Sequence, residues 1–203
     1  MVEMAGEELL LATIGASAPE VARLLKEGAN PNAKDSQGRT ALMIASMKGN
    51  SDIIKTLIKS GATVDAKDGQ GRTALTKAVS LGKVAATRVL ITAKAKIDAR
   101  DNGGWTPLMW ASELGKWNVA KLLISKGADI NTKDKQGWTP LVHAFAEFRL
   151  DGAKLLVSKG VFSINLGSLP QKQFHYACVS VLSGHHQCGA ALRVLSIYAG
   201  SIL

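Results

Sequence analysis

Residues 101–111 read DNGGWTPLMWA, and three other segments of the chain repeat this pattern in the same order. They are DSQGRTALMIA at 35–45, DGQGRTALTKA at 68–78 and DKQGWTPLVHA at 134–144. Each segment has Asp at its first position, Gly at its fourth and Thr at its sixth, and successive copies are 33 residues apart. A constant period of this length indicates an array of structural repeats rather than one globular core.

Each copy predicts a tight turn followed by two short helices. The Asp-x-x-Gly part is typical of a turn in which Gly takes a backbone conformation that larger residues avoid. The Thr stands at the helix N-cap position, and in two copies Pro107 or Pro140 occupies the first helical position. A second helix follows a Gly-containing break, with apolar residues such as Ile54 and Ile58 on one face and Gly61 at its end. Because one such pair of helices cannot bury both of its faces, neighbouring pairs must stack.

The pattern resembles the ankyrin repeat, whose signature runs Asp-x-x-Gly-x-Thr-Pro-Leu-His-x-Ala, and the later Gly-Ala-Asp-Ile-Asn element of that family stands at residues 127–131. The resemblance covers residues 5–165 and implies an all-α ankyrin-repeat solenoid of paired antiparallel helices, with hairpin-like loops projecting to one side. We expect about six repeats, of which the first and last are degenerate caps. The predicted boundaries are 1–33 (N-terminal cap), 34–66, 67–99, 100–132, 133–165, and 166–203 (a degenerate C-terminal cap or a partly disordered tail).

Some residues depart from the family pattern. The family's Thr-to-His hydrogen bond is expected to be missing from the four central repeats, because its His is replaced by Met43, Thr76, Met109 and Val142. Lys94 stands at the position of Gly61 and Gly127 in neighbouring repeats, and a left-handed backbone there would cost a non-Gly residue about 1–2 kcal/mol. In the N-terminal cap, Glu7 and Glu8 stand in place of Thr-Pro, where acidic residues suit the start of a helix.

Composition predicts a soluble intracellular protein. The net charge of +9 and the isoelectric point of about 9.7 come from the body of the chain, because residues 1–33 are acidic. The interpretation we favour for this charge is an ordinary solvated surface, and the alternative is that the basic body attracts acidic or anionic partners through electrostatic steering. The chain begins with Glu3, Glu7 and Glu8 and no early Lys or Arg, unlike a secretory signal, and Cys178 and Cys188 cannot build a disulfide framework. We expect a monomer that is located in the cytoplasm, with the nucleus as an alternative location. We expect that it is not secreted and does not enter a membrane.

Candidate binding residues follow from the concave surface that the resemblance implies, formed by loop tips and first-helix side chains. The column before each Thr contains Arg and Trp, the types most enriched among interface hot spots. Its members are Arg39, Arg72, Trp105 and Trp138. The positions before the inter-helix Gly add Met47, Ser80 and Glu113, and the first helices add Trp110, whose column (Ile44, Lys77, Trp110, His143) we expect to be partly buried. The favoured function is a scaffold or adaptor that binds one or more proteins, with acidic surfaces preferred.

Other interpretations of these columns stay open at this stage. The Arg and Trp side chains can instead cover their own loops. A second, wholly basic column is better interpreted as solvated charge pairs, because each member precedes an Asp. It consists of Lys34, Lys67, Arg100 and Lys133. The main alternative function is binding of nucleic acid or another polyanion, with phosphates on Arg39 and Arg72 and bases stacked on Trp105 and Trp138. No recognised nucleic-acid motif supports it.

An enzyme is the least favoured class, and we predict no cofactor. The Gly-rich turns recur with the repeat and no Lys-Ser/Thr follows them, and no Ser/His/Asp set stands apart from the repeat pattern. The tail offers a possible metal-ligand set in His175, Cys178, His185 or His186, and Cys188. We do not favour it, because the second pair begins only after a predicted helix at 174–181 has ended. The segment around Asn131 resembles ankyrin sites that are hydroxylated on Asn.

Overall fold

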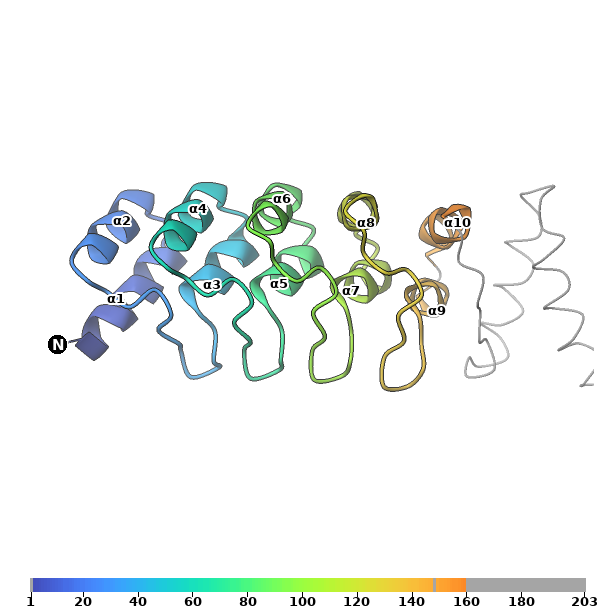
Figure 1. Cartoon of the computed structure of the whole chain (residues 1–203), viewed down its shortest axis with the longest axis horizontal. Helices are drawn as coiled ribbons and strands as arrows, with labels where there is room; N and C mark the ends of the chain where they lie inside the picture. Colours follow the sequence, from blue (N-terminus) through green and yellow to red (C-terminus); the bar gives the residue numbers. More distant parts are fainter. Residues whose placement is uncertain (1, 148, 160–203) are drawn as a thin grey trace, which may run out of the picture.

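The computed structural model describes residues 2–147 and 149–159, and these residues form ten short helices. The helices follow one another in pairs along a single row (Figure 1). Their bounds are α1 Val2–Ile14, α2 Ala18–Lys26, α3 Ala41–Lys48, α4 Ser51–Lys59, α5 Ala74–Ser80, α6 Val84–Thr92, α7 Pro107–Glu113, α8 Trp117–Ser125, α9 Pro140–Ala146 and α10 Leu150–Ser158. These residues contain no strand, only a single backbone pairing of Lys34 with Thr40. The prediction of an all-α fold is confirmed.

Three predictions lie outside the described residues. They are the C-terminal cap at 166–203, the helix at 174–181 and the possible metal ligands between His175 and Cys188. They stay predictions, as do the boundaries and the number of repeats.

The helices form two layers. α1, α3, α5, α7 and α9, the first helices of successive pairs, lie in one layer, and α2, α4, α6, α8 and α10, the second helices, lie in the other (Figure 1). Each first helix packs against its own second helix and against the next first helix. The loops between pairs project beyond the first-helix layer, on the side away from the second helices (Figure 1). The molecule therefore has a loop side and a second-helix side, separated by the first helices.

Two columns of leucine at the repeat period hold the layers together. The first helices supply Leu9, Leu42, Leu75, Leu108 and Leu141, and the second helices supply Leu24, Leu57, Leu90, Leu123 and Leu156. All of them are buried, and complete burial of a leucine side chain contributes about 1.5–3 kcal/mol. The pair α1–α2 supplies a member of each column, so it packs in register with the repeats that follow.

The first helices of the four central pairs each begin after a Thr. The side-chain oxygens of Thr40, Thr73, Thr106 and Thr139 accept a hydrogen bond from the backbone N–H three residues later, at 3.3–3.4 Å. This satisfies one of the free amides of each helix start. No Thr-to-His bond is present among these four, as predicted. In one repeat another bond takes its place, because the hydroxyls of Thr73 and Thr76 lie 3.2 Å apart.

The helix α1 extends further toward the N-terminus than the sequence predicts. It begins at Val2, so Glu7 and Glu8 lie in its middle, where both are exposed. The interpretation of these glutamates as helix-start residues is therefore wrong. The physical reason is that no Asp-x-x-Gly turn precedes them, so nothing in the local sequence stops the helix from continuing.

A residue with a left-handed backbone lies two positions after the last residue of each of the second helices α2, α4, α6 and α8. Gly28, Gly61 and Gly127 have φ angles of 92°, 87° and 88°, and Lys94 keeps the same conformation with a φ of 62°. Lys94 therefore has the left-handed backbone that its position in the repeat indicated. This conformation is unfavourable for Lys because its Cβ atom crowds the backbone.

We predict that Lys94→Gly raises the midpoint of thermal unfolding by a few degrees. Relief of left-handed strain should gain about 1–2 kcal/mol, and the greater freedom of Gly in the unfolded chain should offset about 0.4–1 kcal/mol of it. Circular dichroism melting of the full chain measures the change. Gly61→Lys is the matched reverse change, because an added Cβ there meets no atom within 4 Å and only backbone strain is introduced. A lower midpoint for Lys94→Gly would contradict this account.

A second stability prediction concerns Thr87, whose equivalents in neighbouring repeats are Ile54 and Ala120. Its hydroxyl oxygen is buried in α6 without a hydrogen-bond partner. Thr87→Val keeps the shape and removes the unsatisfied group, so it should stabilise the fold by about 1 kcal/mol. Urea unfolding measures it, with Thr92→Val as control, since the exposed Thr92 hydroxyl donates to the Arg88 carbonyl at 2.9 Å. Loss of stability in Thr87→Val would show that the hydroxyl has a partner after all.

Candidate partner-binding site

Each loop aspartate closes its own turn. The Oδ1 atom of Asp35 accepts hydrogen bonds from the backbone N–H groups of Gln37 and Arg39, at 2.9 and 2.8 Å. The same two bonds, at 2.8–2.9 Å, form in the other three loops, at Asp68, Asp101 and Asp134. The prediction that these aspartates build the loops by bonding their own backbone is confirmed.

The second carboxylate oxygen, Oδ2, of each aspartate faces a side-chain nitrogen, and the donor differs from loop to loop. The four pairs are Arg39 Nε with Asp35 at 2.7 Å, Lys77 Nζ with Asp68 at 2.7 Å, Trp110 Nε1 with Asp101 at 2.9 Å, and His143 Nε2 with Asp134 at 2.9 Å. In the last three pairs the donor lies nine residues after the Asp, on the first helix. Ile44 holds that place in the first loop and has no donor, so the loop arginine serves instead.

In the second loop a lysine and an arginine compete for one oxygen. Because Lys77 binds Asp68 Oδ2, the Arg72 Nε lies 3.7 Å from the same atom and is buried without a hydrogen-bond partner. The Arg72 guanidinium instead lies over the Trp110 ring, 5.7 Å from its centre. Burial raises the pKa of Asp68, but the hydrogen bond from Lys77, the backbone N–H of Arg72 and the Lys77 charge together hold it below its ordinary value. The ionised carboxylate therefore stabilises the fold above its unfolded pKa, and this stability is lost as the pH falls through the folded value.

Four aromatic side chains from the third and fourth loops and first helices meet in one group, which we call the Trp–His cluster: Trp105, Trp110, Trp138 and His143. The Trp105 ring centre lies 4.7 Å from that of Trp110 and 4.1 Å from that of His143. The Trp138 ring centre lies 5.3 Å from that of His143. The three indoles are half-buried, whereas His143 is only 1% exposed. The imidazole is thus the buried centre of a partly exposed aromatic surface.

His143 also ties two repeats together. Its Nδ1 lies 3.1 Å from Glu113 Oε2 at the end of α7, and its Nε2 faces Asp134 in the loop before α9. Both ring nitrogens face carboxylate oxygens, and both donate only when the ring carries two protons. Because Glu113 lies 30 residues before His143, this contact fixes α7 relative to α9.

The structure brings five of the eight predicted site residues together and leaves three apart. Trp105, Trp110 and Trp138 form the Trp–His cluster, Arg72 lies over Trp110, and Glu113 binds its histidine. Arg39 is bound to its own loop aspartate instead.

Met47 and Ser80 are half-buried near the ends of α3 and α5, and the Ser80 hydroxyl donates to the Lys77 carbonyl at 3.0 Å. The residues that sequence reasoning missed are His143 and Lys77. The sequence did contain a signal for them, because both stand in the same repeat position as Trp110. A polar side chain on a buried helix face needs a nearby hydrogen-bond partner.

The wholly basic loop column has a structural role that differs from the predicted charge pairs. Lys34 Nζ donates to the Lys67 carbonyl at 3.1 Å, Lys67 Nζ to the Arg100 carbonyl at 2.8 Å, and Arg100 Nη1 to the Lys133 carbonyl at 2.6 Å. Lys34, Lys67 and Arg100 therefore bond the backbone of the next loop rather than the Asp beside them, because that Asp already accepts bonds from its own turn. The column links neighbouring loops and leaves few of their cations free.

Two large apolar side chains lie exposed beside the predicted contacts. Leu81 directly follows Ser80 and is 48% exposed, and Leu114 directly follows Glu113 and is 37% exposed. Because positions 81 and 114 are 33 residues apart, exposed leucines stand at equivalent positions of successive repeats, each beside a predicted contact residue. Exposed apolar side chains and half-buried aromatic rings are typical of surfaces that contact another macromolecule.

Comparison with known families agrees with this geometry. A family model described as ankyrin repeats (3 copies) matches residues 9–101, 63–134 and 91–168. The three overlapping matches cover well over half of the chain. The chain is an ankyrin-repeat protein. Ankyrin repeats generally serve as protein–protein interaction modules and are typically non-catalytic. No curated protein matches the chain.

Within the part of this ankyrin array that the structure describes, two further searches give negative results. No group of three or more His, Cys, Asp or Glu side chains is arranged to hold a metal ion. Across the same residues, none of the helices combines the length and apolar character that crossing a bilayer requires.

The competition at Asp68 yields a prediction by double-mutant cycle. Lys77→Ile copies the side chain at the equivalent position 44, and Arg72 should then close its 3.7 Å gap to Asp68, as Arg39 does with Asp35. We expect a small loss of stability for Lys77→Ile alone. With Arg72→Ala added, the buried carboxylate loses both side-chain donors, and the double variant should lose at least about 1–2 kcal/mol more than the sum of the single changes. Urea unfolding measures all three, and additive losses would show that Arg72 does not replace Lys77.

Proposed function

We propose that this ankyrin-repeat protein is a scaffold or adaptor that binds a partner protein through the loop side and the first helices. The observation that carries the proposal is the Trp–His cluster. Its three half-exposed indoles are held by the Trp110–Asp101 bond and by ring contacts with buried His143. Because these rings are already fixed, a partner that packs on them loses little side-chain entropy on binding.

The proposed surface changes character along the row. Its first half carries Arg39 and Arg72, and its second half carries Trp105, Trp110 and Trp138. Around them lie Met47, Ser80 and Glu113 at the ends of first helices, with the exposed Leu81 and Leu114 next to two of these. A partner with apolar or aromatic side chains over the tryptophans and acidic groups elsewhere suits this arrangement, and the net charge of +9 favours its approach.

Binding of nucleic acid or another polyanion is the alternative, and the state of the cations weighs against it. Arg39 is paired with Asp35, and the loop column from Lys34 to Arg100 donates to backbone carbonyls. Cations that are already paired release fewer counterions when they meet phosphate, so they contribute less to polyanion binding.

The same proposal describes a monomer in the cytoplasm that has no catalytic activity and no cofactor. The typically non-catalytic role of ankyrin repeats supports the absence of activity. Gel filtration with light scattering of the full chain at micromolar concentration tests the monomer.

We predict that substitutions on this surface abolish partner capture from extract of the native cell. Trp105→Ala/Trp138→Ala removes two indoles of the Trp–His cluster, and hot-spot residues typically cost 2 kcal/mol or more each, roughly a thirtyfold loss of affinity or greater. Affinity capture followed by mass spectrometry compares the bound proteins with those of the wild type. Recovery of the same proteins in equal amounts would refute the assignment of the site.

A second variant separates binding from folding, because removal of packed indoles also lowers stability. Leu81→Glu/Leu114→Glu changes two exposed side chains and should keep the thermal midpoint while losing the partner. Arg23→Ala on α2 is the control, since the side chain of this exposed residue pairs with Glu20 and Glu27 of its own helix and its loss should leave capture unchanged. Captured material that is nucleic acid, with binding that falls steeply as salt rises, would favour the alternative function.

A further inference from the structure

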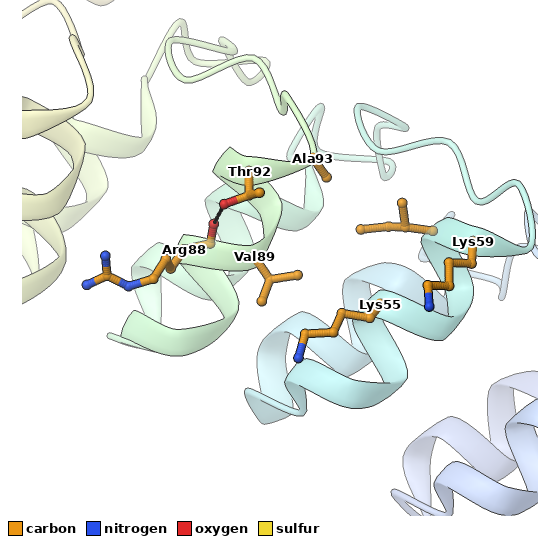
Figure 2. A pocket seen from close by; sticks show the side chains of 7 residues that line it. Lys55, Lys59, Arg88, Val89, Thr92 and Ala93 are labelled. Atoms are coloured by element: carbon orange, nitrogen blue, oxygen red, sulfur yellow. Dashed lines mark hydrogen bonds between the residues drawn. The ribbon is translucent and has the colours of Figure 1, made fainter.

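A groove lies between the second helices α4 and α6 (Figure 2). Both helices lie on the side of the molecule opposite the loops (Figure 1). The volume of the groove is about 400 Å³. The floor is apolar and consists of Ile58, Val89 and Ala93, all half-buried. Three exposed cations line it as well, Lys55 and Lys59 from α4 and Arg88 from α6. The groove therefore combines an apolar base with positively charged edges.

These cations are nearly free of intramolecular partners. Within the described residues no carboxylate lies within ion-pair distance of Lys59 or Arg88, and Lys55 has only the exposed Asp52 at 3.4 Å. Exposed pairs of this kind contribute little, so Lys55 can exchange this partner for another. In Figure 2 the Arg88 guanidinium extends away from α4 while Val89 lies between the helices. Because Arg88 is exposed and unpaired, it can turn toward a bound carboxylate.

The basic character continues along the second helices. Lys55, Arg88, Lys121 and Lys154 are 33 residues apart, all are exposed, and they give each second helix from α4 to α10 one cation at the same position. The equivalent residue of α2 is Ala22, and the Arg23 of that helix is neutralised by Glu20 and Glu27. Unlike the loop column, these side chains do not bond backbone carbonyls of the next repeat in the part of the chain that the structure describes. A ladder of exposed positive charge, in which Lys55 has the weak Asp52 contact, therefore begins at α4 and crosses the groove.

We propose that the groove between α4 and α6 is a second binding surface, separate from the loop side, which takes an acidic amphipathic helix of a partner protein. Its apolar face would pack on Ile58, Val89 and Ala93, and carboxylates on its flanks would pair with Lys55, Lys59 and Arg88. This chemistry complements both features of the groove. The apolar floor alone would fit any apolar segment, and the cations alone would fit any acidic one; the two together fit a segment that is both.

The walls of the groove favour a helix over an extended peptide. They are the side chains of two helices, whose backbone amides and carbonyls are already bonded within each helix, so an extended peptide would lose the hydration of its own backbone without gaining partners. A helix satisfies its own backbone groups and presents apolar residues three and four apart along one stripe. Single-stranded nucleic acid is less suitable, because the lining contains no aromatic ring on which bases could stack.

Fluorescence anisotropy with the full chain tests the proposal. The probe is a fluorescein-labelled 15-residue peptide with Leu at helix positions i, i+3, i+4 and i+7 and Glu on both flanks of this stripe. We expect saturable binding, a gain of helical circular dichroism, and a loss of affinity of at least about tenfold in Lys59→Glu/Arg88→Glu. Both substituted residues are exposed, so the fold should persist.

Lys126→Glu/Lys159→Glu is the matched control, because it makes the same charge change at exposed residues away from the groove and should change affinity less than about threefold. A peptide of the same composition with its leucines scattered should bind at least about tenfold more weakly. Equal binding of the scattered peptide, equal losses in the two double variants, or tighter binding of a labelled oligothymidine that competes for the same site would overturn the proposal.

This proposal is independent of the loop-side function. Leu81→Glu/Leu114→Glu should leave binding of the helical probe unchanged, and Lys59→Glu/Arg88→Glu should leave capture of the loop-side partner unchanged. Loss of probe binding in the leucine variant would place the probe on the loop side and refute the second surface.

Discussion

The carboxylate of the loop aspartate is the interaction on which the rest of this structure depends. One of its oxygens holds the turn by accepting two backbone N–H groups, and the other binds a side chain of the same loop or of the first helix. The side chain of Asp68 is almost completely buried, with 3% exposed, and a carboxylate at such a site needs donors for both oxygens. In three of the four loops the aspartate therefore fastens the loop to the first helix that follows it.

The side chain that donates to the aspartate Oδ2 differs between repeats, so repeats with the same backbone present different surfaces. Arg39, Lys77, Trp110 and His143 all bind the same kind of oxygen with different side chains. Where the donor is Trp or His, its ring also becomes a surface for neighbouring aromatic rings. The Trp–His cluster is thus a consequence of how two loops satisfy their aspartates, and the same contacts that stabilise those loops hold the proposed binding surface rigid.

The two long sides of the row have different chemistry because their cations have different partners. On the loop side, Lys34 and Lys67 donate to carbonyls of the next loop and so serve cohesion between repeats. On the second-helix side the backbone carbonyls are used within the helices, and the cations of α4 to α10 extend into solvent. An identical charge therefore contributes to stability on one side and remains available for binding on the other.

The sequence by itself determined the repeat, the all-α fold, the Thr caps and the role of the loop aspartates, because all of these depend on residues within a few positions of each other or on a strict 33-residue period. It also indicated the left-handed Lys94, since position 94 stands in a column of glycines.

Only the tertiary structure decided which side-chain nitrogen binds each Asp Oδ2. It showed that Lys77 rather than Arg72 binds Asp68, and that His143 contacts Glu113 of the preceding helix pair. These choices are made between side chains that lie close in space but up to 30 residues apart, where reach, burial and competition for one oxygen decide the outcome. The start of α1 also needed the structure, because no local stop signal marks it. A periodic sequence thus defines where each residue stands in its repeat, whereas the contacts between neighbouring repeats define what its side chain does there.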